Sequence, residues 1–256
     1  FPIIERISYS ALSNFHHCGK YFELVNVKKV EPKKGTPQTS FGTLVHKYLQ
    51  MVLNHEELVP LAIKKYNETW IRYCRLWKIE KKFQDLRPIG DKVIYYINGF
   101  LKSKFGNFKV LHIEFPIYHK VPNFPQNFKG FIDLVIELPN GKIIIIDIKT
   151  AGSAFFFNKY KDAFKEYQLT LYKKFYSEIQ NVPRDNIETC FMVIEKVVDS
   201  KKPIILIEVS SGDVKVANAE SWLLNSLSAI NSSKFIKNRL SCNKFGKERR
   251  TSIGFV

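Results

Sequence analysis

Apolar residues recur at helical spacing through the first hundred or so residues of the chain. From Ser8 to about Phe105 they return roughly once per helical turn, as Tyr9, Leu12 and Phe15 do at the start of this region. This period is typical of amphipathic helices that bury one face. We therefore expect the N-terminal part to be a layer of helices.

Proline, glycine and polar residues divide this helical region. Two of the expected helices cover 54–77 and 91–101, with a break between them at Pro88 and Gly90. The segment 31–39 contains two prolines and is mostly polar, which predicts a loop.

After about residue 106 the pattern changes to short runs rich in Val, Ile and Phe, separated by turn residues, which is typical of β-strands. The expected elements are strands over 110–118, 129–138, 142–148, 187–197 and 203–209, and helices over 159–179 and 214–230. This order predicts one α/β domain over 1–256. Its parts would be a mainly helical N-terminal elaboration (1–106), a core of sheet and helices (107–235) and a basic tail (236–256).

The net charge narrows the choice of partner. Lys and Arg number 40 against 24 Asp and Glu, a formal net charge of +16, which favours a polyanion such as nucleic acid. A membrane surface is the second candidate, but the chain has no apolar run of about 18 residues and no charged and then apolar leader. We expect a soluble, unexported protein without a membrane partner. Basic residues also come in pairs, which favours contact with phosphates; the pairs are 28–29, 33–34, 64–65, 81–82, 173–174, 201–202 and 249–250.

The most informative stretch is a predicted hairpin that carries two carboxylates and a lysine. Side chains alternate along a strand, so Asp147 and Lys149 project from one face while Ile146 and Ile148 project from the other. The run before Asp147 is apolar, as in a central strand, where an unpaired carboxylate is costly.

The turn of the hairpin decides whether Asp133 joins that face. A two-residue turn would send the two carboxylates to opposite faces of the sheet. A three-residue turn of Pro139, Asn140 and Gly141, with the glycine in the left-handed conformation, places Asp133 opposite Asp147. We favour this second turn, because proline and glycine stand where it requires them.

Two carboxylates that face each other across a strand pair repel, so a cation is expected between them. Mg²⁺ or Mn²⁺ prefers carboxylate oxygens and can activate water for hydrolysis. Lys149 on the same face can orient or deprotonate such a water, or neutralise charge that develops on a phosphate. The alternative is a solvated hairpin face on which Asp and Lys side chains pair across strands.

The order of these residues, Gly130-x-x-Asp133, a hairpin, then Asp147-x-Lys149, resembles the active-site signature of the PD-(D/E)XK nuclease superfamily. Three further motifs are similar to those of its RecB-type exonuclease branch and occur in the expected order: Ser8–Cys18, Phe41–His46 and Gln168–Tyr172. The resemblance implies the restriction-endonuclease-like core, a central mixed sheet flanked by helices, here with an N-terminal helical elaboration.

The resemblance also implies roles for individual residues. The metal ligands would be His46, Asp133, Asp147, the carbonyl of Ile148 and Glu114, and the catalytic residues would be Lys149, Asp133, Asp147, Gln168 and Tyr172. Gln168 and Tyr172 lie one turn apart on a helix, so both can reach the same phosphate or the lysine, and Gly42 leaves room for close approach beside His46. The alternatives are a core histidine at 46, a surface glutamate on an edge strand at 114, and polar tips on a helix flank at 168 and 172.

By this resemblance the chain would be a Mg²⁺- or Mn²⁺-dependent deoxyribonuclease, more an exonuclease than an endonuclease. It would act on DNA ends or single strands in recombination, repair or replication, leave 5′-phosphates, and work in the cytoplasm of a bacterium or a phage-infected host. The alternatives are a nuclease of the CRISPR-adaptation type and a nucleic-acid-binding module without catalysis. Some members of the branch hold an iron–sulfur cluster on four cysteines. Cys18 and Cys242 lie at comparable ends here but lack companions, so no cluster is expected.

Three consecutive aromatic residues, Phe155, Phe156 and Phe157, follow the strand of Asp147 and Lys149. They either fill the core between sheet and helix or offer a ring that stacks on a base of a single strand. The tryptophans expected in the core are Trp70, Trp77 and Trp222.

Overall fold

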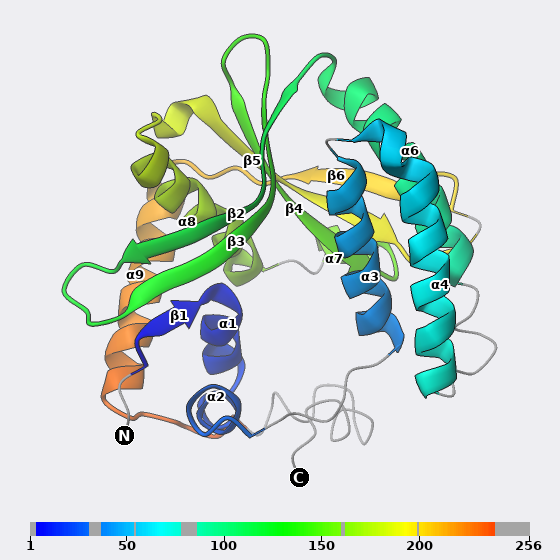
Figure 1. Cartoon of the computed structure of the whole chain (residues 1–256). Helices are drawn as coiled ribbons and strands as arrows, with labels where there is room; N and C mark the ends of the chain where they lie inside the picture. The colour runs from blue at the N-terminus through cyan, green and yellow to red at the C-terminus, as the bar shows by residue number, and fades with distance from the viewer. Residues whose placement is uncertain are drawn as a thin grey trace. The chain divides into compact units, whose positions relative to one another are not determined.

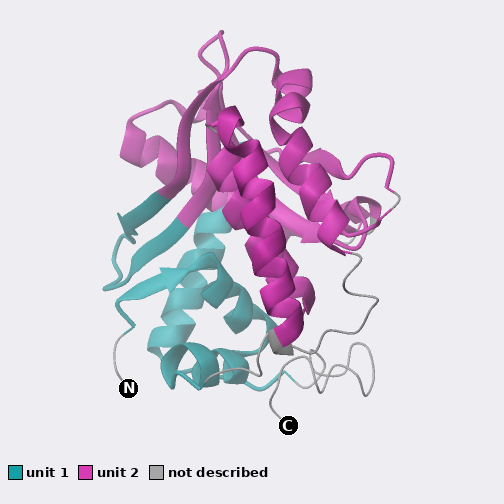
Figure 2. Ribbon diagram, turned by 45° about the vertical axis from the view of Figure 1, so that its right-hand side comes forward, with its two compact units in different colours: residues 1–34, 116–130, 212–256 teal, residues 35–115, 131–211 magenta. Residues whose placement is uncertain are grey.

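The computed structural model describes residues 4–30, 37–53, 55–77, 86–159, 162–198 and 200–238, apart from the side chains of Leu76, Trp77 and Phe156. The chain divides into two compact units (Figure 2). Unit 1 comprises residues 1–34, 116–130 and 212–256, and unit 2 comprises residues 35–115 and 131–211. Each unit draws on stretches far apart in the sequence, so the units do not follow the predicted division at 106 and 235. From residue 239 onward the predicted basic tail, with Cys242, lies outside the described residues.

The helices and strands follow the predicted order closely (Figure 1). Unit 1 contains β1 (Arg6–Ser8), α1 (Tyr9–His17), α2 (Gly19–Phe22), η1 (Glu23–Val27) and α9 (Asp213–Asn231). The helices of unit 2 are α3 (Pro37–Val52), η2 (Glu56–Leu58), α4 (Val59–Trp77), α6 (Leu86–Phe105), α7 (Ala154–Lys159), α8 (Ala163–Gln180) and η3 (Arg184–Asn186). Unit 2 also holds β4 (Ile143–Ala151), β5 (Ile187–Glu195) and β6 (Ile204–Glu208), whereas β2 (Lys109–Lys120) and β3 (Asn127–Glu137) belong to both units. None of the described helices is both long and apolar enough to cross a bilayer.

Six strands form one mixed sheet in the order β1-β3-β4-β5-β6, with β2 also paired to β3. The central strand β4 runs antiparallel to β3 and parallel to β5, and β6 follows antiparallel to β5. Residues 143–148 of β4 are all buried, as their apolar sequence predicts for a central strand. The mixed sheet with flanking helices confirms the predicted α/β class with N-terminal helices.

The main core of unit 2 lies between one face of the sheet and the helices α3, α4 and α6, which pack against one another (Figure 1). Ile146 and Ile148 of β4 enter this core, together with the fully buried Tyr66 and Trp70 of α4. By strand alternation Asp147 and Lys149 face the other way, and α8 packs against β4 and β5. Trp70 is therefore a core residue as predicted, Trp222 of unit 1 is only half-buried, and the side chain of Trp77 lies outside the description.

The hairpin between β3 and β4 has the predicted three-residue turn. Gly141 adopts φ +80°, the left-handed conformation that such a turn requires. The register pairs Leu134 with Ile146, so one step further along it Asp133 stands opposite Asp147. The prediction that a bulged turn sends both carboxylates to one face is confirmed.

The predicted helix break at Pro88 and Gly90 is wrong. Helix α6 begins at Leu86, so Pro88 falls in its first turn, where the missing N–H of proline leaves no hydrogen bond unmade. Gly90 lies inside the helix because Tyr66 of α4 crosses it closely: a Cβ atom built there would meet the Tyr66 ring at 2.2 Å. Glycine at this position serves helix packing and does not end the helix.

Two other segments differ from their predictions. β1 was not predicted, since three residues show no period; it pairs in parallel with β3 from Arg6↔Asn127 to Ser8↔Lys129. Helix α3 begins at Pro37, so residues 37–39 of the predicted loop are helical, as suits proline at a first helical position. Residues 31–36 of that loop lie outside the described residues.

Candidate active site

Strand β4 contributes a buried carboxylate and the lysine beside it. The side chain of Asp147 is 3% exposed, and the Nζ atom of Lys149 lies 2.7 Å from its Oδ2 atom. Although Oδ2 touches this ammonium, it accepts no well-directed hydrogen bond among the described residues. Burial alone lowers the pKa of Lys149, but the negative charges of Asp147 and Asp133 more than offset this and raise that pKa.

The second carboxylate, Asp133 on β3, lies between β4 and helix α3. Its Oδ2 atom accepts a hydrogen bond of 2.6 Å from the amide of Ile148, and its Oδ1 atom lies 3.8 Å from Nδ1 of His46. Burial and the neighbouring charge of Asp147 raise the pKa of Asp133 well above its usual value. Burial lowers the pKa of His46, although the charge of Asp147 acts in the opposite direction. Burial therefore favours the neutral imidazole, the form that binds metal ions.

Glu114 of β2 is a third carboxylate at this site. It lies beside Asp133, and burial raises its pKa. Its φ of +54° is unusual for a non-glycine residue within a strand and marks local backbone strain. The amide of Gln50 donates a hydrogen bond of 2.5 Å to Oε1 of Glu114. Sequence reasoning did not identify Gln50; its only signal is that it follows Gly42 and His46 at four-residue spacing on α3.

Helix α8 holds the carboxylate of Asp147 from the other side. Nε2 of Gln168 donates to Oδ1 of Asp147 at 2.9 Å and lies within hydrogen-bond distance, 3.2 Å, of the Tyr172 hydroxyl. Both side chains are buried, and burial raises the pKa of Tyr172, which therefore remains a phenol. Gln168 and Tyr172 were expected to reach a phosphate or the lysine; here Gln168 contacts the metal-ligand candidate Asp147, and Tyr172 contacts Gln168.

The structure thus brings the predicted catalytic and metal-ligating residues together in one cluster within unit 2: His46, Glu114, Asp133, Asp147, Ile148, Lys149, Gln168 and Tyr172. As the side chains stand, no three His, Cys, Asp or Glu residues among those described gather closely enough to hold an ion. The donor set nevertheless suits Mg²⁺ or Mn²⁺, since it offers carboxylates, a carbonyl and a neutral imidazole. The buried Oδ2 of Asp147, which pairs with the Lys149 ammonium and has no hydrogen-bond donor among the described residues, fits a cation that replaces this ammonium.

The packing of α3 against β4 depends on Gly42, which lies one turn before His46. A Cβ atom at Gly42 would lie 3.0 Å from the Oγ1 atom of Thr150 on β4. The absence of a side chain therefore lets the helix approach the strand that carries Asp147.

A matched pair of variants tests this close approach. In Gly99→Ala on α6, where a Cβ meets nothing within 4 Å, helix propensity should raise the free energy of unfolding by about 1 kcal/mol. Gly42→Ala gains the same helix propensity, but its new methyl group overpacks the contact with β4 at a cost of about 1–3 kcal/mol. We therefore expect its free energy of unfolding, measured in urea, to fall by up to about 2 kcal/mol. Displacement of His46 should also slow any reaction catalysed at this site by about 10- to 100-fold. An equal gain in stability at both positions would contradict the role of Gly42.

The predicted basic pairs have different surroundings in the structure. The pairs 64–65 and 201–202 are exposed, as contact with phosphates requires. Lys173 and Lys174 are only 9% exposed, and the Lys174 ammonium lies 2.6 Å from Glu178, so the prediction of a phosphate surface is wrong for this pair. The pairs at 33–34, 81–82 and 249–250 lie outside the described residues.

The aromatic residues that follow β4 were expected either to fill the core or to stack on a base, and the two described side chains differ in this respect. Phe157 packs edge-on against the buried Phe191 of β5, with ring centroids 5.4 Å apart, and therefore belongs to the packing of α7 on the sheet. Phe155 on the same helix is 66% exposed, and the ammonium of Lys159 lies 5.9 Å from the centre of its ring. Core filling is thus wrong for Phe155, and the stacking of its ring on a base stays a prediction.

Comparisons with known proteins identify the family of the chain and a solved structure of similar fold. The family model of the PD-(D/E)XK nuclease superfamily matches residues 6–243. A crystal structure of a candidate exonuclease from Eubacterium rectale has a similar fold, with a TM-score of 0.57 and 12% identity over 94% of this chain and 86% of that one. The crystal structure of SSO0001 is 16% identical, with a TM-score of only 0.42 over 89% of this chain and 78% of that one. No curated protein matches the sequence significantly.

Proposed function

Because the chain belongs to the PD-(D/E)XK nuclease superfamily, we propose that it is a Mg²⁺- or Mn²⁺-dependent deoxyribonuclease of the RecB type. It degrades DNA from ends or along single strands and leaves 5′-phosphates. The observation that carries this proposal is the convergence of Asp133, Asp147 and Lys149 with the neutral imidazole of His46.

Each residue of the cluster has a task in this reaction. Asp133, Asp147, His46 and the Ile148 carbonyl would hold the metal ion, with Glu114 beside them. When bound, Mg²⁺ or Mn²⁺ supplies a Lewis acid at the reacting phosphate. Lys149 orients the attacking water and neutralises charge that develops on the phosphate. Gln168 and Tyr172 keep the Asp147 carboxylate in one orientation.

The preference for ends and single strands has two supports. One is the set of motifs similar to the RecB-type exonuclease branch, with the E. rectale candidate exonuclease as a solved protein of similar fold. The other is the exposed ring of Phe155, the second residue of α7. An exposed aromatic ring can stack on an unpaired base. The net charge of +16 supports a phosphate backbone as the substrate.

Substrates that differ only in their ends test the proposal. With Mg²⁺ or Mn²⁺, we expect linear DNA to be degraded to products that carry 5′-phosphates, while end-blocked linear DNA and closed circles persist. Chelation of the metal should stop the reaction, and added Mn²⁺ should restore it. Cleavage of circles at the linear rate would show an endonuclease. Binding without cleavage of any substrate would show a nucleic-acid-binding module.

A further inference from the structure

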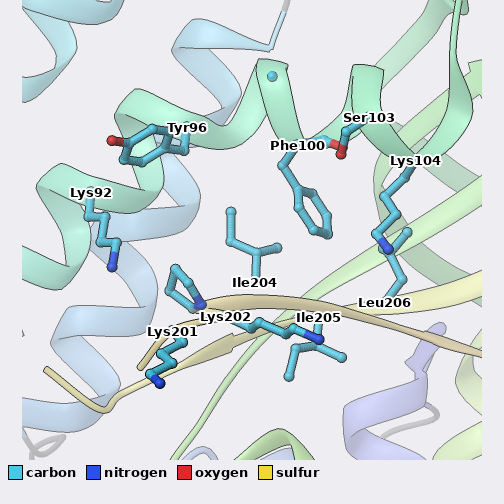
Figure 3. Close-up of a pocket in the computed structure, with 12 residues that line it drawn as sticks. Lys92, Tyr96, Phe100, Ser103, Lys104, Lys201, Lys202, Ile204, Ile205 and Leu206 are labelled. Carbon is cyan, nitrogen blue, oxygen red and sulfur yellow. The ribbon is translucent and has the colours of Figure 1, made fainter. Parts of the chain in front are cut away.

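Unit 2 has a groove, separate from the cluster of ionisable residues described above, between helix α6 and strand β6 (Figure 3). Its volume is about 740 Å³, within the range of sites that bind ligands. Its floor is apolar: Phe100 of α6 points toward Ile204, and Leu206 lies further along the same strand (Figure 3). Tyr96 stands at the rim and is 54% exposed.

The described residues that line the groove carry charges of one sign. Among them are four lysines, Lys92 and Lys104 from α6 and Lys201 and Lys202 before β6, and no carboxylate. The ammonium of Lys92 lies 3.3 Å from the carbonyl of Ser200. Among the described residues, no carboxylate pairs with the other three lysines, so they are available to an anionic ligand.

Strand β6 adds a third feature. In the described sheet it pairs with β5 alone and stands at the end of the strand order. An end strand offers its outer N–H and C=O groups to a further extended segment. Ile204 and Leu206 point to the same side of β6, so a segment laid beside this strand can place alternate side chains on the apolar floor.

We propose that the groove binds an acidic peptide segment of a partner protein, in extended form along β6. Apolar side chains of the segment would lie on Phe100, Ile204 and Leu206, and its carboxylates would face Lys104, Lys201 and Lys202. A peptide fits better than a nucleic acid strand, because phosphates use the lysines but leave the apolar floor and the strand edge without a partner. This site does not depend on the nuclease cluster, and it supplies a means of recruiting the protein to a complex.

Titration by NMR tests the groove directly. The probe is a pool of eight-residue peptides in which Asp or Glu alternates with Leu, Ile, Phe or Tyr, added to the full chain with labelled methyl groups. We expect shifts at Ile204, Ile205 and Leu206, with half-saturation at about 100 µM or below. The same pool with Lys in place of the acidic residues should produce none.

Charge reversal then separates the groove from general attraction to a basic protein. The double variant Lys201→Glu, Lys202→Glu should weaken peptide binding at least about tenfold, in line with loss of charge-assisted contacts. The matched variant Lys64→Glu, Lys65→Glu on α4 changes the net charge equally and should leave it within about twofold. Equal weakening by both variants, or no methyl shift at about 1 mM of the pool, would overturn the proposal. So would shifts of the same methyl groups by a thymidine oligonucleotide and not by the peptides, which would make the groove a DNA contact.

Discussion

Asp147→Asn should reduce cleavage of linear DNA by at least about 10³-fold while DNA affinity stays within a few-fold of the wild type. Asparagine keeps the shape of the side chain, and its carbonyl oxygen can still accept the hydrogen bond of Gln168. It lacks the negative charge at the buried Oδ2 position, which we propose as a metal ligand. Cleavage rates and DNA affinity, measured separately, check this expectation.

A control variant and a measurement of metal binding show whether the effect of Asp147→Asn comes from loss of the proposed metal site. Asp185→Asn makes the same chemical change at an exposed residue of η3 and should leave cleavage unchanged. Mn²⁺ should raise the unfolding temperature of the wild type and of this control, because a ligand that binds the folded state stabilises it. It should not raise that of Asp147→Asn. If Asp147→Asn cleaves within tenfold of the wild type, the proposed metal site is wrong.

Lys149→Gln should lower kcat by about 10²- to 10⁴-fold and change KM only a few-fold. The expected difference between kcat and KM follows from the position of Lys149, whose ammonium lies 2.7 Å from Oδ2 of Asp147, one of the residues that would hold the metal ion. Charge neutralisation there matters most when negative charge develops during the reaction. Steady-state kinetics with saturating Mg²⁺ measure both constants.

The control for Lys149 lies on the same hairpin. Lys142 pairs with Glu188 at 2.6 Å, and both side chains are substantially exposed, so the pair should contribute little to stability. Lys142→Gln should therefore leave kcat and KM unchanged. A loss of affinity with unchanged kcat in Lys149→Gln would make this lysine a DNA contact and remove it from the catalytic residues.

The hairpin shows how far local sequence predicts the site. Proline at 139 and glycine at 141 require one turn type, and that turn alone places Asp133 opposite Asp147. Strand alternation then puts Lys149 on the same face as Asp147. These relations hold within a few residues of chain, so they follow from backbone geometry and need no knowledge of the remaining fold.

Other features depend on segments that meet only after folding. Gln50 donates a hydrogen bond to Glu114, which lies 64 positions later in the sequence, and no sequence pattern around a helical glutamine predicts such a partner. The same limit explains Gly90, which was expected to end a helix but accommodates the ring of Tyr66. It also explains why Lys173 and Lys174 were predicted to lie on the surface: two adjacent lysines are typical of a solvated surface, but packing buries both.

By itself the sequence determined the order of most helices and strands and the register of the hairpin, because each rests on periodicity or on the conformational limits of a few neighbouring residues. The motifs of a PD-(D/E)XK nuclease were also visible in the sequence, but through their resemblance to a known family. Only the tertiary structure decided that α8 holds Asp147 through Gln168, that Gln50 supports Glu114, and that α6 and β6 enclose a basic groove. Those arrangements arise from packing between distant segments, where side-chain shape and burial decide which groups meet.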